Sequence, residues 1–257
     1  MSDPHALQTS LLDLRFGGNH VLRQVSLGFR AGEITGLIGP NGAGKTSYFN
    51  CLSGHYRPTG GDISYAGRPL NNVSTVQRSR EGLVRTFQHA ALCSEMTLLE
   101  NVVVGLNTTR RSGWADALLP LPEDWTDRES STSRAREALD LVGLGDLADV
   151  TASVAAPGVM RLVELARAAV SQPRIVLLDE PAAGLNSSET KELARVIRQL
   201  RRPDRVILVV EHDMDLIMSV CDRIHVLNFG AVVASGTPSE IQQDPKVAEI
   251  YLGTADA

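Results

Sequence analysis

Cysteine is scarce in this chain, with three residues in 257: Cys51, Cys93 and Cys221. They are far apart in the sequence and no Cys-x-x-Cys pair occurs, so the chain encodes neither a local zinc site nor a redox motif. We therefore expect a reducing, cytoplasmic compartment for this protein.

Long hydrophobic runs are also missing. The longest strand-like apolar run, VILVV at 206–210, is far too short to cross a bilayer. The first ten residues, MSDPHALQTS, contain neither a basic segment nor an apolar segment, so we expect no secretory signal peptide there. If the protein works at a membrane, a partner must supply the membrane span.

Positive charge is not in excess. The chain has 25 Lys and Arg against 30 Asp and Glu, which gives a formal net charge of −5. This balance provides no overall attraction to nucleic acid or to an anionic membrane, and we expect no nucleic-acid partner.

With 257 residues, of which 43% are hydrophobic, the chain suits one large domain or two lobes with a sizeable core.

Apolar strand-like segments alternate with helical segments along the chain. The segments ITGLIG at 34–39, RIVLLDE at 174–180 and RVILVVEHD at 205–213 are predicted strands, because each is apolar over most of its length. Between the last two, residues 187–202 show helical spacing, with apolar residues on one face and charges on the other. Uninterrupted apolar strands that alternate with helices are typical of a mostly parallel sheet, so the predicted fold class is α/β.

Two regions depart from this pattern. Residues 11–33 and 61–70 are typical of antiparallel strands and turns. Residues 107–133 contain two Trp, two Pro and many Ser and Thr, which predicts a surface excursion within a largely helical segment. We predict one domain over 1–257 with three parts: a core with an antiparallel β subdomain from 1–89 and 158–257, a helical subdomain over 90–157, and its insert at 107–133.

The segment GPNGAGKT at 39–46 matches the phosphate-binding pattern GxxxxGK[ST]. Its glycines let backbone N–H groups converge on phosphate oxygens, and the following helix adds its positive N-terminal end. Lys45 is expected to reach the β- and γ-phosphates of ATP, and the Thr46 hydroxyl to coordinate Mg²⁺. The strand before the loop and the helix after it are the context that distinguishes this motif from a chance Gly-rich turn. The predicted nucleotide contacts in the loop are Gly39, Pro40, Asn41, Gly42, Ala43, Gly44, Lys45, Thr46 and Ser47.

Acidic residues and a histidine follow two of the predicted strands. Asp179 ends one strand at the sheet edge where α/β proteins bind ligands, so we expect it to hold Mg²⁺ through water. Glu180 is the candidate general base that polarises the attacking water. In isolation such a pair would more often be a helix cap or part of a solvated loop, but the phosphate loop upstream favours the catalytic interpretation. His212 follows the next strand and is a candidate γ-phosphate contact, although a lone His in this position is more often structural.

Taken in order, these motifs resemble those of the ATP-binding cassette (ABC) ATPase family, and the resemblance covers essentially the whole chain. GPNGAGKT resembles the Walker A loop, IVLLDE the Walker B motif with its catalytic Glu180, and AGLN at 183–186 the D-loop. The resemblance implies a P-loop NTPase (RecA-like) core with a mostly parallel sheet, an antiparallel β subdomain and a helical subdomain. The implied catalytic residues are Lys45, Glu180 and the switch histidine His212.

The same resemblance implies functional roles for two residues to which the local sequence alone gives none. Gln88, in RTFQHA, corresponds to the Q-loop glutamine, which contacts the metal and the transmembrane partner in this family. Phe16, before two glycines, corresponds to the aromatic residue that stacks on adenine; without the family it would be interpreted as a core or loop aromatic. The implied metal ligands are Thr46, Gln88 and Asp179.

Within the family, several stretches are similar to the ATP-binding subunit of branched-chain amino acid importers. They are NCLSGHYRPTGGDI, RTFQH, EPAAGLN, VEHDM and the tail GTPSEIQQDPKVAEIYLG. This similarity implies an energy-coupling ATPase, peripheral at the cytoplasmic side of the cell membrane, with permease subunits and a solute-binding protein as partners. ATPases of lipopolysaccharide export have a similar tail and remain an alternative, because no residue here would touch the transported compound.

The family signature, which resembles LSGGQ, corresponds to AAPGV at 155–159, where only Gly158 is retained. Proline is sterically suited to a helix start, so the fold should tolerate Pro157. In the family each signature donates hydrogen bonds to ATP on the opposite subunit of a dimer, and two of those donors are missing here. We therefore expect a heterodimer with a second ABC ATPase, with a homodimer as the alternative. A weakly hydrolytic ATP-dependent clamp is a further alternative, although Glu180 and His212 are retained.

Overall fold

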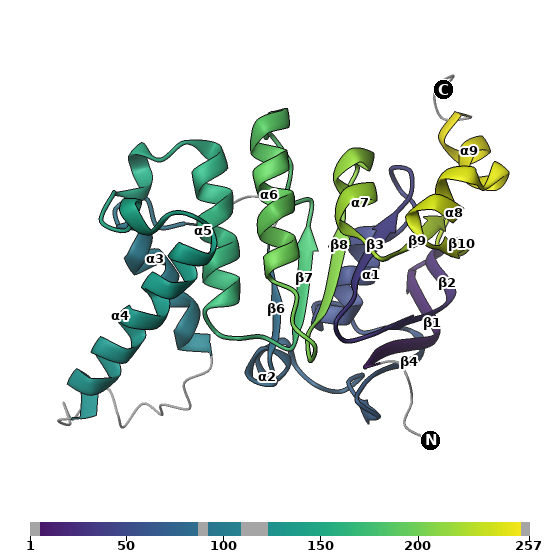
Figure 1. Ribbon diagram of the computed structural model, residues 1–257. Coiled ribbons are helices and arrows are strands. Elements are labelled where there is room, and N and C mark those ends of the chain that lie inside the picture. The colour runs from purple at the N-terminus through teal and green to yellow at the C-terminus, as the bar shows by residue number, and fades with distance from the viewer. Residues whose placement is uncertain (1–5, 87–91, 109–122, 253–257) are drawn as a thin grey trace.

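The computed structural model describes residues 6–86, 92–108 and 123–252 (Figure 1). Within these ranges six strands form a mostly parallel sheet, in the order β10-β9-β3-β8-β7-β6, and β10 is antiparallel to β9. A second sheet, in the order β2-β1-β4-β5, is antiparallel. The mostly parallel sheet and the antiparallel strands over 11–33 and 61–70 are therefore confirmed.

The strands are short except in the antiparallel sheet. That sheet contains β1 (Leu7–Phe16), β2 (Asn19–Phe29), β4 (Gly60–Tyr65) and β5 (Arg68–Pro69). The parallel sheet contains β3 (Ile34–Ile38), β6 (Leu83–Arg85), β7 (Ile175–Asp179), β8 (Val206–Val210), β9 (Arg223–Asn228) and β10 (Ala231–Gly236).

Helices connect the parallel strands and cover the sheet (Figure 1). They are α1 (Lys45–Ser53), α2 (Thr75–Arg80), α3 (Leu98–Val104), α4 (Glu123–Leu141), α5 (Pro157–Ala169), α6 (Ser187–Gln199), α7 (Met214–Val220), α8 (Pro238–Gln243) and α9 (Pro245–Leu252). Short 3₁₀ turns lie at Gly105–Thr108, Gly145–Leu147 and Ala152–Val154.

The parallel sheet separates two hydrophobic cores. Every residue of β3, β7 and β8 is buried, and successive side chains of a strand point to opposite faces. In β7, Val176 and Leu178 belong to a cluster that includes residues of α3 to α7. Ile175 and Leu177 belong to a second cluster, with residues of α1 and of the antiparallel sheet. Burial on both faces explains why these strands are apolar over most of their length; the exceptions are Thr35 in β3 and Asp179 at the end of β7.

Two helices show how local sequence sets the element ends. Helix α1 ends at Gly54, which adopts φ 84° and donates its N–H to the Cys51 carbonyl; glycine is the usual residue for this left-handed helix end. Helix α6 begins after Asn186, whose side chain accepts from the backbone of Ser188 and Glu189 while the Glu189 side chain accepts from Asn186 N. This reciprocal capping satisfies the backbone donors at the helix start. The helix predicted over 187–202 is thus confirmed, and it ends at Gln199.

Helices α3, α4 and α5 form a helical lobe beside the core, on the left in Figure 1. Of the surface excursion predicted over 107–133 within a largely helical segment, residues 123–133 belong to α4. That 107–133 is an insert of the helical subdomain stays a prediction. The buried Ala135, Ala138 and Leu139 follow helical spacing and pack in the cluster shared with α3 and α5, which favours continuation of the helix. Residues 109–122 lie outside the described part of the chain.

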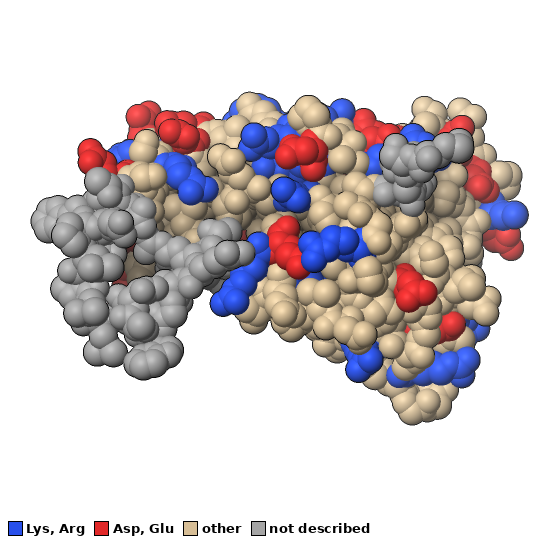
Figure 2. All heavy atoms as spheres, turned by 90° about the horizontal axis from the view of Figure 1, so that it is seen from below, with Lys and Arg blue, Asp and Glu red and all other residues tan. Residues whose placement is uncertain are grey.

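The described residues contain no helix suited to span a membrane, and the face shown in Figure 2 is mixed in charge. Among the residues that the structure describes, no helix is long and apolar enough to cross a bilayer. On the face shown in Figure 2, basic side chains lie interspersed with acidic ones. The expectation that nucleic acid is not a partner stays a prediction.

Candidate functional site

A pocket of about 260 Å³ lies at the N-terminal end of α1. The loop between β3 and α1 forms most of it, together with residues that follow β7 and β8. Because these strands are parallel neighbours, their carboxyl ends meet at one edge of the sheet. We call it the α1 pocket; its lining residues are Val21, Asn41, Gly42, Ala43, Gly44, Lys45, Thr46, Ser47, Glu180 and His212. All of them except Val21 are among the residues that the sequence predicts for the site.

Glycine shapes the loop of the α1 pocket at two positions. Gly39 follows β3 with φ 151°, and a Cβ there would overlap the carbonyl oxygen of Leu227 in β9. Gly44, directly before α1, has φ 103°. Residues with a side chain rarely adopt such conformations. The N–H of Gly230 donates to the carbonyl of Ala43 at 3.0 Å, so the turn between β9 and β10 supports the loop.

Lys45 is a buried cation within this loop. Its Nζ donates to the carbonyl oxygens of Gly39 at 2.6 Å and of Pro40 at 3.0 Å. Burial lowers the pKa of Lys45, and the negative charges of Glu180 and Asp179 partly offset this effect. A cation held at a helix N-terminus is suited to bind an anionic phosphate group.

Glu180 and His212 meet because β7 and β8 are neighbours in the sheet. Glu180 follows Asp179 with φ 47°, an uncommon conformation for a residue with a side chain, and its N–H donates to the carbonyl of Val210 at 2.9 Å. This hydrogen bond continues the β7–β8 ladder by one residue. The Glu180 Oε1 then lies 3.0 Å from the His212 Nε2. The predicted base and the predicted phosphate contact therefore form one acid–imidazole pair at the pocket wall.

Glu211 supports this pair and was missed by sequence reasoning. Its carboxylate is buried; Oε1 accepts from the Ala182 N–H at 2.6 Å, and Oε2 accepts from the N–H groups of His212 at 2.9 Å and Asp213 at 3.3 Å. Burial raises the pKa of Glu211, although the three hydrogen bonds act in the opposite direction. One side chain thus joins the loop after Glu180 to the loop that carries His212. The available signal was an acid directly after an entirely apolar strand.

Asp179, the predicted metal carboxylate, is buried beside the α1 pocket and pairs with Arg85. The Arg85 Nη2 donates to Asp179 Oδ2 at 2.6 Å, and both side chains are 8% exposed. Arg85 comes from β6, the strand next to β7. Sequence reasoning did not identify Arg85 and predicted no strand there; the available signal was a charge directly after the apolar pair Leu83 and Val84.

Five of the described residues that were predicted for the site are not part of the lining of the α1 pocket: Phe16, Gly39, Pro40, Gly158 and Asp179. Phe16 ends β1, is about half exposed, and packs edge-to-face against Tyr56 with ring centroids 5.1 Å apart. Gly158 lies in the first turn of α5, where a Cβ would overlap the Glu189 side chain, so its glycine also serves helix packing. Gln88 lies outside the described residues. The roles of Phe16, Gly158 and Gln88 as nucleotide contacts stay predictions.

The α1 pocket fits a triphosphate nucleotide with a divalent cation. The buried Lys45 ammonium and the glycine-rich backbone provide groups that bind phosphate. The Thr46 hydroxyl and the Glu180 carboxylate line the same pocket, and Asp179 adjoins it. Hydroxyl and carboxylate oxygens are the ligands that Mg²⁺ prefers.

Comparisons with known proteins agree with this geometry. Residues 22–183 match the family described as ABC transporter, and residues 231–257 match the family described as branched-chain amino acid ATP-binding cassette transporter. The chain is 46% identical over 256 residues to the high-affinity branched-chain amino acid transport ATP-binding protein LivG of Salmonella typhimurium, covering 99% of this chain and 100% of the relative. It is 41% identical to the corresponding protein BraF of Pseudomonas aeruginosa, with the same coverage.

A solved structure extends the similarity to the fold. The crystal structure of the ADP conformation of an ATP-binding cassette of an ABC transporter superposes with a TM-score of 0.83 at 29% identity. The superposition covers 97% of this chain and 99% of that one.

Proposed function

Because this chain belongs to the ABC transporter family of ATPases, we propose that it is the energy-coupling subunit of an importer for branched-chain amino acids. The observation that carries the proposal is similarity over the full length to LivG, including a tail over 231–257 that matches a branched-chain transporter family. The predicted P-loop NTPase fold is confirmed by the solved structure of an ATP-binding cassette in its ADP conformation, with its TM-score of 0.83. Membership of the family makes the chain an enzyme that hydrolyses ATP to ADP and phosphate.

In the proposed reaction the loop amides and the Lys45 ammonium bind the β- and γ-phosphates of ATP. Glu180 accepts a proton from the water that attacks the γ-phosphorus, and the bond from that phosphorus to the bridging oxygen breaks, which releases ADP. His212 orients the Glu180 carboxylate, which lies 3.0 Å away, and contacts the γ-phosphate.

The remaining predicted residues complete the site in this proposal. Thr46, Asp179 and Gln88 would hold Mg²⁺, which neutralises phosphate charge when bound. Phe16 stacks on adenine, for which its half-exposed ring is available. Gly158 contributes to the nucleotide site of a second subunit.

We further propose that the subunit works as one half of an asymmetric dimer with a different ABC ATPase. Helix α5 begins with Ala156 as its cap, which makes no side-chain hydrogen bond, followed by Pro157, which has no N–H. The start of α5 is therefore poor in donors for a phosphate on an opposite subunit. The site built on this chain's Lys45 and Glu180 is the active one, and the site that 155–159 completes is slow.

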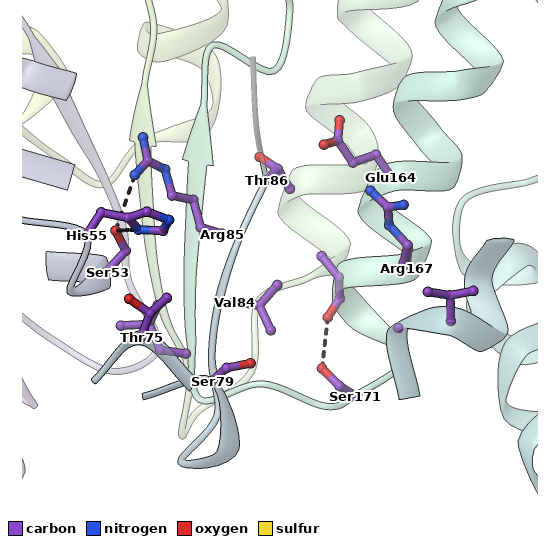
Figure 3. Close-up of a pocket in the computed structure, with 14 residues that line it drawn as sticks. Ser53, His55, Thr75, Ser79, Val84, Arg85, Thr86, Glu164, Arg167 and Ser171 are labelled. Carbon is purple, nitrogen blue, oxygen red and sulfur yellow. Dashed lines mark hydrogen bonds between the residues drawn. The ribbon is translucent and has the colours of Figure 1, made fainter. Parts of the chain in front are cut away.

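A groove between the core and the helical lobe is the proposed docking site for a permease. It has a volume of about 330 Å³ and is lined from both sides (Figure 3). We call it the lobe groove; the lining residues that matter here are Ser53, His55, Val84, Arg85, Glu164 and Arg167. The permease supplies the membrane span, so the chain acts as a peripheral subunit at the cytoplasmic side of the membrane. A solute-binding protein on the other side would deliver the amino acid.

The test is leucine uptake by proteoliposomes that contain the chain, permease subunits, a second ATPase and a solute-binding protein. We expect uptake that requires ATP and is abolished by Glu180→Gln, which should preserve ATP binding while stopping hydrolysis. Tight ATP binding without turnover in every combination would instead identify a clamp. ATP turnover stimulated by a lipopolysaccharide-exporting permease but not by an amino acid permease would identify the exporter alternative.

A further inference from the structure

Arg85 lies between the α1 pocket and the lobe groove, and contacts residues on both sides. Its Nη2 donates to Asp179 Oδ2 at 2.6 Å. Its Nη1 donates to Asn50 Oδ1 at 2.6 Å and to Ser53 Oγ at 3.2 Å. Its guanidinium also lies 5.9 Å from the ring centroid of Phe49. These contacts hold the guanidinium in one orientation against the predicted metal carboxylate.

The contacts of Arg85 continue into the lobe groove. Ser53 Oγ lies 2.9 Å from His55 Nδ1, and Arg85, Ser53 and His55 all line the groove (Figure 3). Burial lowers the pKa of His55, and the positive charge of Arg85 lowers it further, so the two groups interact electrostatically. A contiguous set of contacts therefore connects the groove surface to Asp179.

Arg85 and a metal cation would compete for the same carboxylate. A guanidinium bound to Asp179 Oδ2 neutralises the charge that attracts a divalent cation, and it repels such a cation at close range. The repulsion is strong because the pair is 8% exposed and water screens it little. The orientation of Arg85 thus sets how readily the Asp179 carboxylate binds a divalent cation.

We propose that Arg85 is a positioning residue that restrains Asp179 against Mg²⁺, and that a permease segment docked in the lobe groove relieves this restraint through Ser53 and His55. The second half of this proposal rests on the proposed function, because it takes the permease as the occupant of the groove. The first half concerns the isolated chain alone.

The first test measures ATP binding by the isolated chain carrying Glu180→Gln, so that ATP is not consumed. Calorimetry gives one Kd for ATP in EDTA and one in Mg²⁺. The Kd in EDTA divided by the Kd in Mg²⁺, called the Mg²⁺ ratio below, rises as Mg²⁺ contributes more to ATP binding. Adding Arg85→Gln should raise this ratio about ten-fold or more, the effect of losing one hydrogen bond between charged groups. An unchanged or lower ratio would overturn the proposal.

Two further variants separate restraint from general stability. Arg161→Gln removes a similarly buried arginine, which pairs with Glu164 at 3.1 Å on α5, away from Asp179; the Mg²⁺ ratio should not change. Arg85→Lys keeps the charge but replaces the planar guanidinium, which reaches Asp179 and Ser53 through two different nitrogens, by a single ammonium nitrogen, so the ratio should rise by a smaller factor. This variant decides the question if Arg85→Gln does not fold. An equal rise in Arg161→Gln would contradict the proposal.

The second test repeats the measurement in the assembly with the permease. The permease should raise the Mg²⁺ ratio of the chain that retains Arg85 and leave that of the Arg85→Gln chain unchanged, because the restraint is already gone. An equal effect of the permease on both chains would overturn the coupling. Failure of the chain to assemble with the permease would contradict the proposed function, while the first test would still decide the role of Arg85.

Discussion

Glu211 links two catalytic loops through a single buried carboxylate, and its loss should affect turnover more than ATP binding. Glu211→Ala leaves the N–H groups of Ala182, His212 and Asp213 without their acceptor, at a cost of about 1–3 kcal/mol for an unsatisfied buried group. We expect kcat to fall about ten-fold or more, because Glu180 and His212 lose their fixed separation. The KM for ATP should change little, because the loop at 39–47 keeps its own supports.

Steady-state ATPase kinetics of the assembled transporter would measure both constants. Glu192→Ala is a matched control, because Glu192 is a partly exposed acid on α6 that pairs with Arg195. A Glu211→Ala enzyme with normal kcat would show that the two loops hold their positions without this side chain.

The ionisation of Glu211 should also make stability depend on pH. Burial raises the pKa of Glu211 above its ordinary value of 4.5, so the folded chain retains a proton at pH values where the unfolded chain has lost it. The free energy of unfolding should therefore fall as pH rises from about 4.5 through the folded pKa. Glu211→Gln cannot ionise and should lack this contribution. Urea denaturation of both chains across this range would measure the difference, and parallel curves would contradict it.

At the scale of elements, the start of α5 depends on a glycine that packs against the cap of α6. A Cβ at Gly158 would overlap the Glu189 side chain, which is held by the backbone of Asn186. Gly158→Ala should therefore displace the Glu189 carboxylate from its hydrogen bond to Asn186 and destabilise the chain by about 0.5–1 kcal/mol. Chemical denaturation would show a lower midpoint. Gly18→Ala is a suitable control, because a Cβ there meets nothing within 4 Å; equal stability of both variants would contradict the packing argument.

Elements whose signals are local could be predicted from the sequence. Residues 175–178 of β7 are apolar because the strand is buried on both faces, and α6 carries its start signal in Asn186 and Glu189. The position of Glu180 beside His212 was predictable in outline, since both follow neighbouring parallel strands. These features depend on residues close in sequence or on a simple sheet rule.

Contacts between distant segments could not be predicted in the same way. The Arg85–Asp179 pair joins residues 94 positions apart, and nothing in the local sequence of either residue specifies the other. Residues 123–133 belong to α4 although they are mostly polar, because Ala135, Ala138 and Leu139 further along bury an apolar face in the lobe. Tertiary packing decided both features, and local propensity did not.

At the scale of the whole molecule, the missing donors at 155–159 should limit turnover when two copies of this chain face each other. Ala156→Ser, Pro157→Gly and Val159→Gln together would restore donors to the start of α5. We expect this triple variant to raise the ATPase rate of the chain alone by about 10² or more, since a single transition-state donor contributes about that much. In a mixture with a second ATPase that carries a complete signature, the gain should be much smaller.

The rate per chain, measured with and without the second ATPase, tests this expectation. The triple variant carrying Glu180→Gln is the control, and it should show no turnover. A wild-type chain that alone hydrolyses ATP as fast as the mixture would remove the argument for an asymmetric dimer.

The two cores on either side of the parallel sheet have a consequence for how the molecule denatures. Leu98 and Leu139 of the helical lobe share a cluster with Ile34 and Val209 of the sheet, while the opposite faces of the same strands close the other core. If the packing of either cluster were lost, one face of the shared strands would be exposed to water, and the other cluster would lose the support of those strands. Calorimetry of the isolated chain should therefore record one cooperative heat-absorption peak, with van 't Hoff and calorimetric enthalpies in agreement; two separable peaks would mean that the lobe melts independently.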